Sequence, residues 1–583
     1  MTDKLWCLRA PWSLLLILTA CAGPIPQPAE ILPTPAATSP PLSPRNPPAT
    51  LPGSAETASP AGMAIPSGMA TPSPLPQIGL RPILPELSLD HREHYRPLFH
   101  YTPAANWMND PNGMVHYQGE YHLFYQHYPY GMVWGDMHWG HAVSADLIHW
   151  RELPVALAPD QHGTIFSGSA VVDWHNSSGF QTGPEPPLVA IYTQFFLGRQ
   201  RQSLAYSNDK GRSWVKYAAN PVLDTFFCRD PKVFWYEPGA NWVMSLACGK
   251  AIRFYTSPNL KAWREAGTFE GEGARGGHWW ECPDLFRLPV LNEAGKQKWV
   301  LLVSVDDEGP NGGSGMQYFV GEFDGQRFSN HHPSDEVRWF DYGPDDYAGV
   351  TWSDAPDGRR IAIGWMNNWL YAKSPEMPTS PWRGAMTLPR ELGLYREGDG
   401  YRLTQTPVRE FEALRRNPDV LVATPRRTRL FTHSLDAAAF ALHLELEAPA
   451  TGILKFEART RSGDRLGLIL DPDRRQIRLE RPAAPHTDAL PSFAGTQTAP
   501  LPSGRVLKLD LIFDASSLEV FIDGGKTVFT DLAFPRDTHY DLSLSANEQF
   551  RLDRAESKRI VNSEQGDGGL RCRLLWPWRP SAG

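Results

Sequence analysis

The sequence predicts an all-β fold in two parts, a β-propeller followed by a C-terminal β-sandwich, and three observations predict it. From about residue 95, short apolar or alternating runs are broken by Gly, Pro, Asn and Asp, with scarcely any segment of helical period. A loose repeat of Ser, Asp or Asn, and Trp recurs at residues 144–150, 207–214 and 257–263. Beyond about residue 420, longer runs alternate cleanly between apolar and polar residues. Repeated short units are typical of propeller blades, and long strands with one buried face are typical of a sandwich.

The first twenty residues predict an export signal. Two basic residues precede an apolar run over residues 12–18, which is too short to span a bilayer. Leu18-Thr19-Ala20-Cys21 resembles a bacterial lipoprotein cleavage box, in which the Cys becomes the lipidated first residue of the mature chain. The alternative is an ordinary signal peptide with a chance Cys, but a long linker follows this one. We therefore expect removal of residues 1–20, lipidation of Cys21, and an extracytoplasmic lipoprotein anchored to a bacterial membrane at the cell envelope or surface.

Residues 21–90 are predicted to be a disordered linker. Residues 22–85 hold 18 of the 55 prolines, mixed with Ala, Ser and Thr and with almost no aromatic residues. Such a segment cannot bury enough apolar surface to order itself. Proline-rich chain is extended, rising about 3.1 Å per residue in polyproline II, so it can hold a folded domain clear of a membrane.

Residues 91–410 are predicted to form the propeller. In each repeat unit, the Asp or Asn is expected to bond the local backbone of a hairpin turn while the Trp packs on the following strand. Chance turns in a Trp-rich β protein are the alternative for any single unit. Units a few tens of residues apart favour blades.

Residues 420–560 are predicted to form the sandwich, after a helical turn or short linker at residues 411–416 and before a loose tail at 561–583. The residues expected to face the sandwich core are Phe440, Leu442, Leu444, Leu446, Leu507, Leu509, Leu511, Phe513, Leu518, Val520 and Ile522. The alternating polar residues are expected to face away from it.

Composition excludes some classes of function. A formal net charge of −8 leaves no basic field to gather phosphates, which argues against nucleic acid as a partner. Cys7 lies in the predicted signal and Cys21 is the predicted lipidation site. The other four cysteines do not have the spacing of a structural zinc site. The sequence leaves open whether Cys228 is a free buried thiol or pairs with Cys248 or another Cys. The 21 Trp suit sugar rings, although most Trp in β proteins fill the core.

Three acidic residues occupy constrained settings: Asp110 and Asp230, each followed by Pro, and Glu281 between Trp280 and Cys282. A following Pro pushes the acid toward extended geometry, which would aim its carboxylate from the end of a strand. Each Asp-Pro alone predicts only a turn. Together the three residues suit glycoside hydrolysis with retention, in which a carboxylate nucleophile and a carboxylic acid lie about 5 to 5.5 Å apart.

The surroundings of these residues in the sequence suggest their roles. Glu281 follows Trp279 and Trp280, and apolar neighbours would raise its pKa and suit it to act as the acid. Asp110 lies beside Asn109 and Asn112, whose amide donors would keep it ionised as the nucleophile.

The segments around these acids resemble glycoside hydrolase family 32, which includes invertases, exo-inulinases and levanases. The motifs that carry the resemblance, in order, are Trp107-Met-Asn-Asp-Pro-Asn-Gly113, Phe124-Tyr-Gln126, Trp134, Phe166-Ser-Gly-Ser169, Arg229-Asp-Pro231, Glu281-Cys-Pro-Asp284, Gly364-Trp-Met-Asn-Asn-Trp369 and Ser517-Leu-Glu-Val-Phe521. The resemblance covers roughly residues 95 to 555, and ordered motifs are a far stronger signal than any one alone.

The resemblance implies a five-bladed propeller with a funnel-shaped site on its axis. Asp110 would form a covalent intermediate with a terminal fructosyl unit, Glu281 would act as acid and base, and Asp230 would stabilise the transition state. The residues expected to shape the fructose pocket are Asn109, Gln126, Trp134, Phe166, Ser167, Arg229, Asp345 and Trp365. The implied substrates are inulin, levan or sucrose, and the implied chemistry requires no metal or cofactor.

Two alternatives come from other classes. A fructosyltransferase would share the covalent intermediate and differ only in the acceptor. A non-catalytic carbohydrate-binding surface protein would keep the fold, but the presence of all three carboxylates argues against it. The segments at residues 134–139 and 381–390 are more similar to exo-inulinases and levanases than to plant invertases.

Overall fold

Nearly all the regular secondary structure in the part of the chain that the structure describes is β-strand. The computed structural model describes residues 93–274, 278–421, 430–447, 451–502, 504, 506–547 and 551–561, which belong to one compact unit of the chain, residues 85–583. The predicted signal, Cys21, the linker, and the tail after residue 561 lie outside the described residues. Within the described part, no helix has the length and apolar character needed to cross a membrane.

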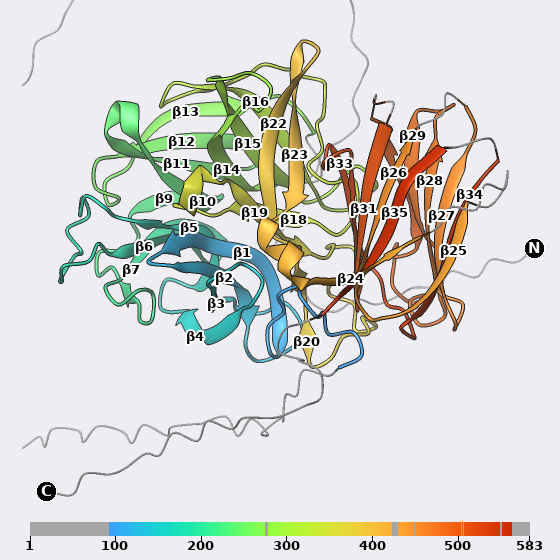
Figure 1. Ribbon diagram of the computed structural model, residues 1–583. Coiled ribbons are helices and arrows are strands. Elements are labelled where there is room, and N and C mark those ends of the chain that lie inside the picture. Colours follow the sequence, from blue (N-terminus) through green and yellow to red (C-terminus); the bar gives the residue numbers. More distant parts are fainter. Residues whose placement is uncertain are drawn as a thin grey trace, which may run out of the picture. The chain divides into compact units, whose positions relative to one another are not determined.

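Residues 106–407 form the five sheets of a propeller, as expected (Figure 1). The first blade contains β1 (Asn106–Tyr117), β2 (Glu120–Tyr128), β3 (His138–Ser144), β4 (Arg151–Leu157) and β20 (Trp382–Arg383), and the second contains β5 (Thr164–Val172), β6 (Leu188–Phe196), β7 (Arg199–Ser207), β8 (Val215–Lys216) and β9 (Leu223–Phe226). The third contains β10 (Cys228–Tyr236), β11 (Asn241–Cys248), β12 (Ala251–Ser257) and β13 (Arg264–Glu270). The fourth contains β14 (Trp280–Pro289), β15 (Gln297–Val305), β16 (Gly315–Phe323) and β17 (Phe328–Asn330). The fifth contains β18 (Tyr347–Thr351), β19 (Ile361–Met366), β21 (Ala385–Met386), β22 (Arg390–Glu397) and β23 (Gly400–Pro407).

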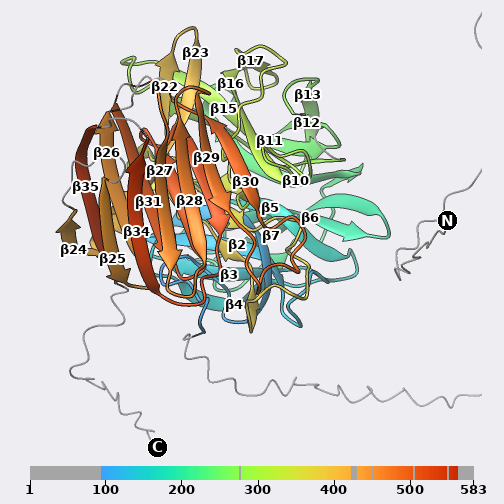
Figure 2. The same cartoon turned by 90° about the vertical axis from the view of Figure 1, so that its right-hand side faces the viewer.

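Two six-stranded sheets form the sandwich, which Figure 2 shows face-on. One sheet contains β24 (Arg415–Val420), β35 (Arg551–Ile560), β26 (Phe440–Glu447), β31 (Val506–Asp514), β32 (Ser517–Ile522) and β33 (Thr527–Leu532). The other contains β25 (Phe431–Asp436), β34 (His539–Ala546), β27 (Leu454–Thr460), β28 (Arg465–Asp471), β29 (Gln476–Arg481) and β30 (Gly495–Pro500). Short 3-10 helices occupy Glu237–Gly239 (η1), Pro356–Gly358 (η2) and Arg409–Leu414 (η3). Since β24 pairs with β35, the sandwich begins at Arg415, slightly before the predicted boundary.

The repeated Ser-to-Trp units are equivalent turns between the third and fourth strands of the first three blades, as predicted. Asp146 accepts backbone N–H bonds from residues 148 and 149, and Asn259 does the same from residues 261 and 262. In the second blade, Asp209 accepts from the N–H of Ser213. Asp324 makes the same kind of turn in the fourth blade, where the flanking Ser and Trp are absent and the repeat therefore escaped recognition.

The alternation predicted for the sandwich is confirmed in β26 and β31, whose predicted core residues are all buried in one cluster. Strand β32 differs, because both of its faces are buried. Leu518, Val520 and Ile522 face the sandwich core, whereas Phe521 packs in the cluster that contains the propeller residues Trp107 and Trp352. The second face of β32 is therefore buried because it covers the propeller.

Candidate active site

The first strands of the five blades, β1, β5, β10, β14 and β18, contact one another in a ring. Each has a break in its pairing register at the site: between Met108 and Pro111, Ile165 and Gly168, Arg229 and Lys232, Glu281 and Asp284, and Tyr347 and Val350. A bulge puts two residues opposite one and re-aims a side chain out of the regular alternation. A small cavity lined by residues of all five strands lies at this ring. The five bulges thus bring side chains from every blade to one place.

Asp110 lies in the β1 bulge, and its carboxylate is buried and hydrogen-bonded. Ser167 Oγ donates to its Oδ2 at 2.7 Å, and Asn109 Nδ2 donates to its Oδ1 at 3.0 Å. Trp107 Nε1 donates to Asn109 Oδ1 at 2.7 Å and so fixes the amide. The prediction that Asn109 serves this carboxylate is confirmed. Asn112 instead donates to the backbone carbonyl of Asp110, at 3.1 Å.

Ser167 reaches Asp110 because the β5 bulge lies close to the next strand, β6. The N–H of Gly168 donates to Asn112 Oδ1 at 3.3 Å. A Cβ at residue 168 would lie 2.2 Å from the carbonyl oxygen of Ile191, so only glycine fits there. The Phe-Ser-Gly-Ser motif therefore combines the hydroxyl that bonds Asp110 with the glycine that lets it approach.

Asp230 also lies in a bulge, but not in the extended geometry expected from the Pro that follows it. Its φ is +61°, in the left-handed region, so the prediction of extended geometry is wrong here, although Asp230 does lie near the start of β10. The N–H of Asp230 donates to Thr193 Oγ1 at 2.9 Å, and the N–H of Cys282 donates to Asp230 Oδ2 at 3.1 Å. The tight bulge, which the sequence did not reveal, directs this carboxylate.

Glu281 has polar partners rather than the apolar surroundings expected from its neighbours in sequence. Arg229 Nη2 lies 2.9 Å from its Oε1, and the Tyr347 hydroxyl donates to its Oε2. Trp280 alternates to the opposite face and packs in the core, and Trp279 stacks against the Arg229 guanidinium, 4.5 Å from the ring centroid. The prediction of an acid held among apolar rings is therefore wrong, because the strand alternation turns Trp280 away.

The three carboxyls influence one another. Burial raises the pKa of Asp110 to about 6, with a further upward push from the Glu281 carboxylate, while the bonds from Ser167 and Asn109 oppose the shift. Burial and the charge of Glu281 also raise the pKa of Asp230, against the attraction of Arg229. The expectation that local donors alone keep Asp110 ionised is therefore incomplete. A cluster of this kind retains a proton in weakly acidic solution and titrates as a unit.

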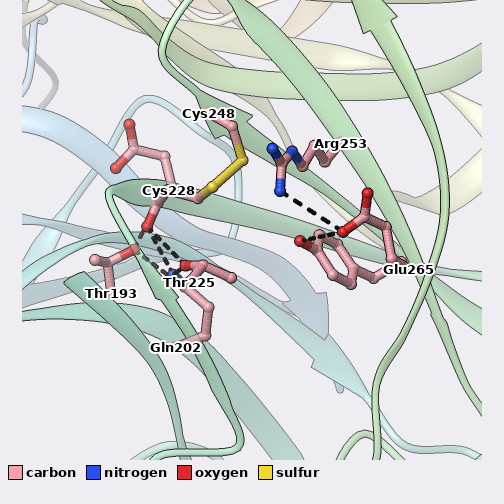
Figure 3. The surroundings of a disulfide bond; sticks show 9 residues. Thr193, Gln202, Thr225, Cys228, Cys248, Arg253 and Glu265 are labelled. Carbon is pink, nitrogen blue, oxygen red and sulfur yellow. Dashed lines mark hydrogen bonds and ion pairs between the residues drawn. A yellow bond between two sulfur atoms is a disulfide. The ribbon is translucent and has the colours of Figure 1, made fainter.

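The cysteines of this region occur in two states, one as a free thiol and two in a disulfide. Cys282 is a free, buried thiol whose Sγ lies 3.8 Å from both Asp110 Oδ2 and Asp230 Oδ2. Cys228 forms a disulfide with Cys248 (Figure 3), which resolves the alternatives left open by the sequence. Burial raises the pKa of the Cys282 thiol well above its usual value, and the Asp230 and Asp110 carboxylates add to the shift. A neutral thiol thus separates two carboxyls.

Aromatic rings lie around the cluster. Trp134 is 39% exposed, and its ring centroid is 6.1 Å from that of Phe166. Lys373 Nζ lies 5.4 Å from the Trp134 ring and 4.8 Å from the Trp369 ring. Gln126, on β2, occupies the position opposite the two bulged residues of β1, and its buried Nε2 has no partner within the described structure. A sugar hydroxyl could satisfy such an amide.

Two predicted pocket residues lie elsewhere. Asp345 is fully buried toward the sandwich, where it pairs with Arg481 at 2.7 Å and accepts from the Tyr371 hydroxyl and the N–H of Leu532. Asp345 precedes β18, so the alternation of that strand does not direct its side chain toward the axis of the propeller. The prediction of Asp345 in the pocket is therefore wrong. Trp365 is also fully buried, with its ring centroid 6.1 Å from that of Trp107, so it supports the site from behind.

Several residues of the site were missed. Tyr347 bonds Glu281, Thr193 bonds Asp230, and Trp369 and Lys373 join the aromatic group. The signal for Trp369 was present, since it ends a quoted motif. Tyr347 stands only two residues after the misassigned Asp345. Tyr347 faces the site because β18 begins at this residue, whereas Asp345 lies before the strand.

Asp284, the last residue of the Glu-Cys-Pro-Asp motif, lies apart from the carboxyl cluster. It pairs with Lys232 at 3.1 Å and accepts from the N–H and hydroxyl of Thr351 at 2.6 and 2.8 Å. These contacts tie β10, β14 and β18 together. The motif therefore combines one residue of the site with one that holds three first strands in place.

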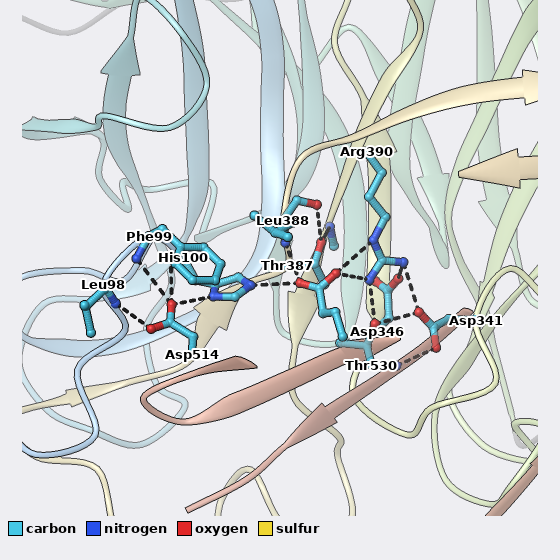
Figure 4. A network of polar contacts seen from close by, with 12 residues as sticks. Leu98, Phe99, His100, Asp341, Asp346, Thr387, Leu388, Arg390, Asp514 and Thr530 are labelled. Atoms are coloured by element: carbon cyan, nitrogen blue, oxygen red, sulfur yellow. Dashed lines mark hydrogen bonds and ion pairs between the residues drawn. The ribbon is translucent and has the colours of Figure 1, made fainter. Parts of the chain in front are cut away.

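Two further motif segments meet in a buried polar network (Figure 4). Glu519 Oε2 accepts from Arg390 Nη2 at 2.8 Å, and its Oε1 lies 2.8 Å from His100 Nε2. Arg390 also pairs with Asp341 and Asp346. Burial acts to lower the pKa of His100, but Asp514 and Glu519 outweigh it and raise that pKa to about 9. The network joins the fifth blade, the segment before the first blade, and the sandwich.

Glu519→Gln is expected to lower the free energy of unfolding by about 3 kcal/mol, because removing one charge of a buried pair leaves its partners uncompensated. Asp357→Asn, which alters an exposed pair with Arg409, is the matched control and should leave the free energy of unfolding nearly unchanged. Urea unfolding at neutral pH checks both variants. Equal stability of the two variants would show that the network does not hold the sandwich to the propeller.

Taken together, the site offers an ionisable carboxyl with two hydrogen-bond donors, a second carboxyl held by a backbone N–H, and a third paired with Arg and Tyr. Such an arrangement suits nucleophilic attack combined with proton transfer at one bond. The surrounding rings suit a sugar.

Comparisons with known proteins agree with this geometry. The model of the "Glycosyl hydrolases family 32 N-terminal domain" matches residues 100–407, and that of the "Glycosyl hydrolases family 32 C terminal" matches residues 410–561. A levanase of Bacillus subtilis (strain 168) is 51% identical over 468 residues, which cover 78% of this chain and 68% of the levanase. A levanase of Bacillus sp. (strain L7) is 38% identical, and the match covers 76% of this chain and half of that protein. An extracellular exo-inulinase of Aspergillus awamori is 36% identical, over 77% of this chain and 91% of that protein.

Solved structures resemble the fold as well. The crystal structure of exo-inulinase from Aspergillus awamori matches with a TM-score of 0.74 at 33% identity, over 81% of this chain and 99% of that one. The β-fructofuranosidase of Schwanniomyces occidentalis, complexed with fructosyl-erythritol, matches with a TM-score of 0.73 at 30% identity, over 82% of this chain and 99% of that one.

Proposed function

The chain belongs to glycosyl hydrolase family 32, and we propose that it is a retaining fructosyl hydrolase that releases terminal fructose from inulin or levan and from sucrose. The observation that carries the proposal is the convergence of three carboxyls from β1, β10 and β14, each with its own donors. The similarity to levanases and exo-inulinases supports the substrate class.

In the first step, an Asp110 carboxylate oxygen attacks the anomeric carbon of the terminal fructosyl unit. The bond from that carbon to the glycosidic oxygen breaks, and Glu281 gives its proton to the departing oxygen. The products are a fructosyl ester of Asp110 and a shortened chain, or glucose when the substrate is sucrose. Ser167 and Asn109 hold the Asp110 carboxylate in place for the attack.

In the second step, Glu281 acts as a base. It takes a proton from water as the water oxygen bonds to the anomeric carbon, and Asp110 leaves as a carboxylate. Each displacement inverts the carbon, so the released fructose keeps the configuration of the substrate. Tyr347 and Arg229 orient Glu281 for both steps.

Asp230 is placed to stabilise the oxocarbenium-like transition state through its charge and through bonds to ring hydroxyls. The N–H of Cys282 and the bulge of β10 hold it. Asn109, Gln126, Trp134, Phe166, Ser167 and Arg229 form the fructose pocket around it, with Trp369 as an additional wall and Trp365 behind.

The proposed activity is tested by following products over time on inulin, levan and sucrose. Fructose as the product from the first time points, with retained configuration, is the expected result. A ladder of shorter oligosaccharides would replace the exo assignment with endo cleavage. Transfer of fructose to sugar at low substrate concentration would favour a transferase.

We also propose an extracytoplasmic location through a lipid on Cys21. The cleavage-box sequence that ends at Cys21 and the proline-rich segment after it support the anchor. The name of the similar extracellular exo-inulinase supports a location outside the cell. An enzyme that meets large fructans needs such a position, because polymers do not cross a membrane.

Cys21→Ser is expected to move the enzyme from the membrane fraction to the soluble fraction, because each buried CH₂ of an acyl chain contributes about 0.8 kcal/mol of membrane affinity. Fructose release by each fraction, measured in the bacterial host, reports the location. Cys7→Ser, which lies within the predicted signal, is the matched control and should leave the enzyme in the membrane fraction. A Cys21→Ser variant that still sediments with membranes would contradict lipidation.

A further inference from the structure

A disulfide lies at the end of the strand that carries Asp230. Cys228 is the first residue of β10 and Cys248 the last of β11, and the two are direct partners in the antiparallel ladder. Their Cα atoms are 4.3 Å apart, and both side chains are buried. Figure 3 shows the bond crossing between the two neighbouring strands. The next two residues of β10 are Arg229 and Asp230.

The segment that the disulfide holds has few other ties to the ladder. Before the bulge, β10 pairs with β11 only through Cys228–Cys248 and Arg229–Ala247. Pro231, inside the bulge, has no N–H to donate. Asp230 has a φ of +61°, a conformation that persists only where the surroundings impose it. The end of β10 would therefore fray without a second constraint.

A chain of buried hydrogen bonds provides a parallel tie. Gln202 Nε2 donates to the carbonyl of Cys228 at 2.8 Å, and Thr193 Oγ1 donates to Gln202 Oε1 at 2.8 Å. The N–H of Asp230 then donates to Thr193 Oγ1 at 2.9 Å. The carbonyl of Cys228 and the N–H of Asp230 are thus linked through β6 and β7. These hydrogen bonds keep their lengths only while Cys228 stays in place.

We propose that the Cys228–Cys248 disulfide is a positioning element of the active site, which fixes the end of β10 so that Arg229 reaches Glu281 and Asp230 reaches the reacting sugar. The proposal rests on the catalytic roles given above. It makes fructose release depend on the oxidised state of this bond, in an enzyme whose predicted location favours disulfides.

Reduction by a dithiol such as dithiothreitol is the corresponding redox step. One thiolate of the reagent attacks a sulfur of the disulfide, which forms a mixed disulfide and releases one cysteine thiolate. The second thiolate of the reagent then attacks the reagent's own sulfur in the mixed disulfide and releases the other cysteine thiolate. The reagent loses two electrons and two protons and closes to a cyclic disulfide, while Cys228 and Cys248 each gain a proton and an electron as thiols.

The double variant Cys228→Ser/Cys248→Ser removes the bond at nearly constant volume. Assayed well below its Tm, it should show kcat on sucrose reduced about 10- to 100-fold with KM changed less than about threefold, because a displacement of about 1 Å at a reacting group costs on that order. Its pH profile should also shift, because Arg229, whose charge opposes the upward shift of the Asp230 pKa, would move away. A bond that serves stability alone would lower Tm and leave kcat and the pH profile unchanged, and that result would overturn the proposal.

Reduction of the wild-type enzyme covers the case in which the double variant does not fold. Lost activity should track the fraction of reduced Cys228 and Cys248, which alkylation of quenched aliquots followed by mass spectrometry reports. Reoxidation of the unalkylated sample should restore the activity. Full activity at complete reduction of both residues would overturn the proposal.

A pair of substitutions tests the hydrogen-bond chain independently. Thr193→Val should lower kcat, whereas Thr193→Ser, which keeps the hydroxyl, should retain most of it. Equal kcat in both variants would contradict the positioning role. Failure of the proposed function would look different, because the wild-type enzyme itself would then release no fructose.

Discussion

Asp110→Asn should reduce kcat for fructose release by about 10⁴-fold or more, because an amide cannot form the covalent intermediate and loss of a nucleophile costs on this order. The amide is isosteric, and Ser167 Oγ can still donate to its oxygen. Binding of fructose and the Tm should therefore change little. Kinetics on sucrose and inulin, with calorimetry of fructose binding, measure the two properties separately.

The matched control is Asp345→Asn, which alters a buried carboxylate of the same propeller outside the pocket. Asp345 pairs with Arg481 of the sandwich, so this variant should lose stability while keeping KM and most of kcat at low temperature. An Asp110→Asn variant with kcat within tenfold of wild type would exclude Asp110 as the nucleophile. A raised KM in Asp345→Asn would show that Asp345 does contribute to the pocket.

Glu281→Gln should reduce kcat by about 10²- to 10⁴-fold on sucrose, the usual contribution of a general acid and base. It should also shift the pH profile of kcat. The Glu281 carboxylate helps to raise the pKa of Asp110, so its removal lowers that pKa and moves the acid limb to lower pH. Kinetics across pH check both changes.

Leaving-group dependence provides the control for this variant. An aryl fructoside with a strongly electron-withdrawing ring needs no proton on departure, so its fructosyl transfer to Asp110 should be nearly as fast as in wild type. If the Glu281→Gln variant transfers fructose equally slowly from sucrose and from the activated fructoside, the acid role of Glu281 is contradicted.

The all-β fold could be predicted from local patterns because those patterns reflect local physics. The turns after Ser144, Ser207 and Ser257 depend on short-range bonds from Asp or Asn to the backbone, which any sequence reading can find. The alternation of β26 depends on one buried face. Strand β32 breaks that pattern because its second face covers the propeller, a tertiary contact that no local pattern encodes.

Of the site, the residue types were predictable and their geometry was not. Asp110, Asp230 and Glu281 converge as expected, because their motifs stand in three first strands. The surroundings of Glu281 were mispredicted since neighbours in sequence point to opposite faces of a strand. Asp345 was misplaced because a strand begins two residues after it. Bulges, which re-aim Asp110, Ser167 and Asp230, leave no clear mark in a single sequence.

The most direct test of the account is to trap the covalent intermediate. Glu281→Gln lacks the base that releases it, so an activated fructoside should accumulate fructosyl-enzyme that protease digestion and mass spectrometry can locate. The account predicts one fructosyl unit on the peptide that contains Asp110, absent from the Asp110→Asn/Glu281→Gln double variant. A fructosyl unit on Asp230 or elsewhere, or rapid turnover with inverted product and no adduct, would contradict it.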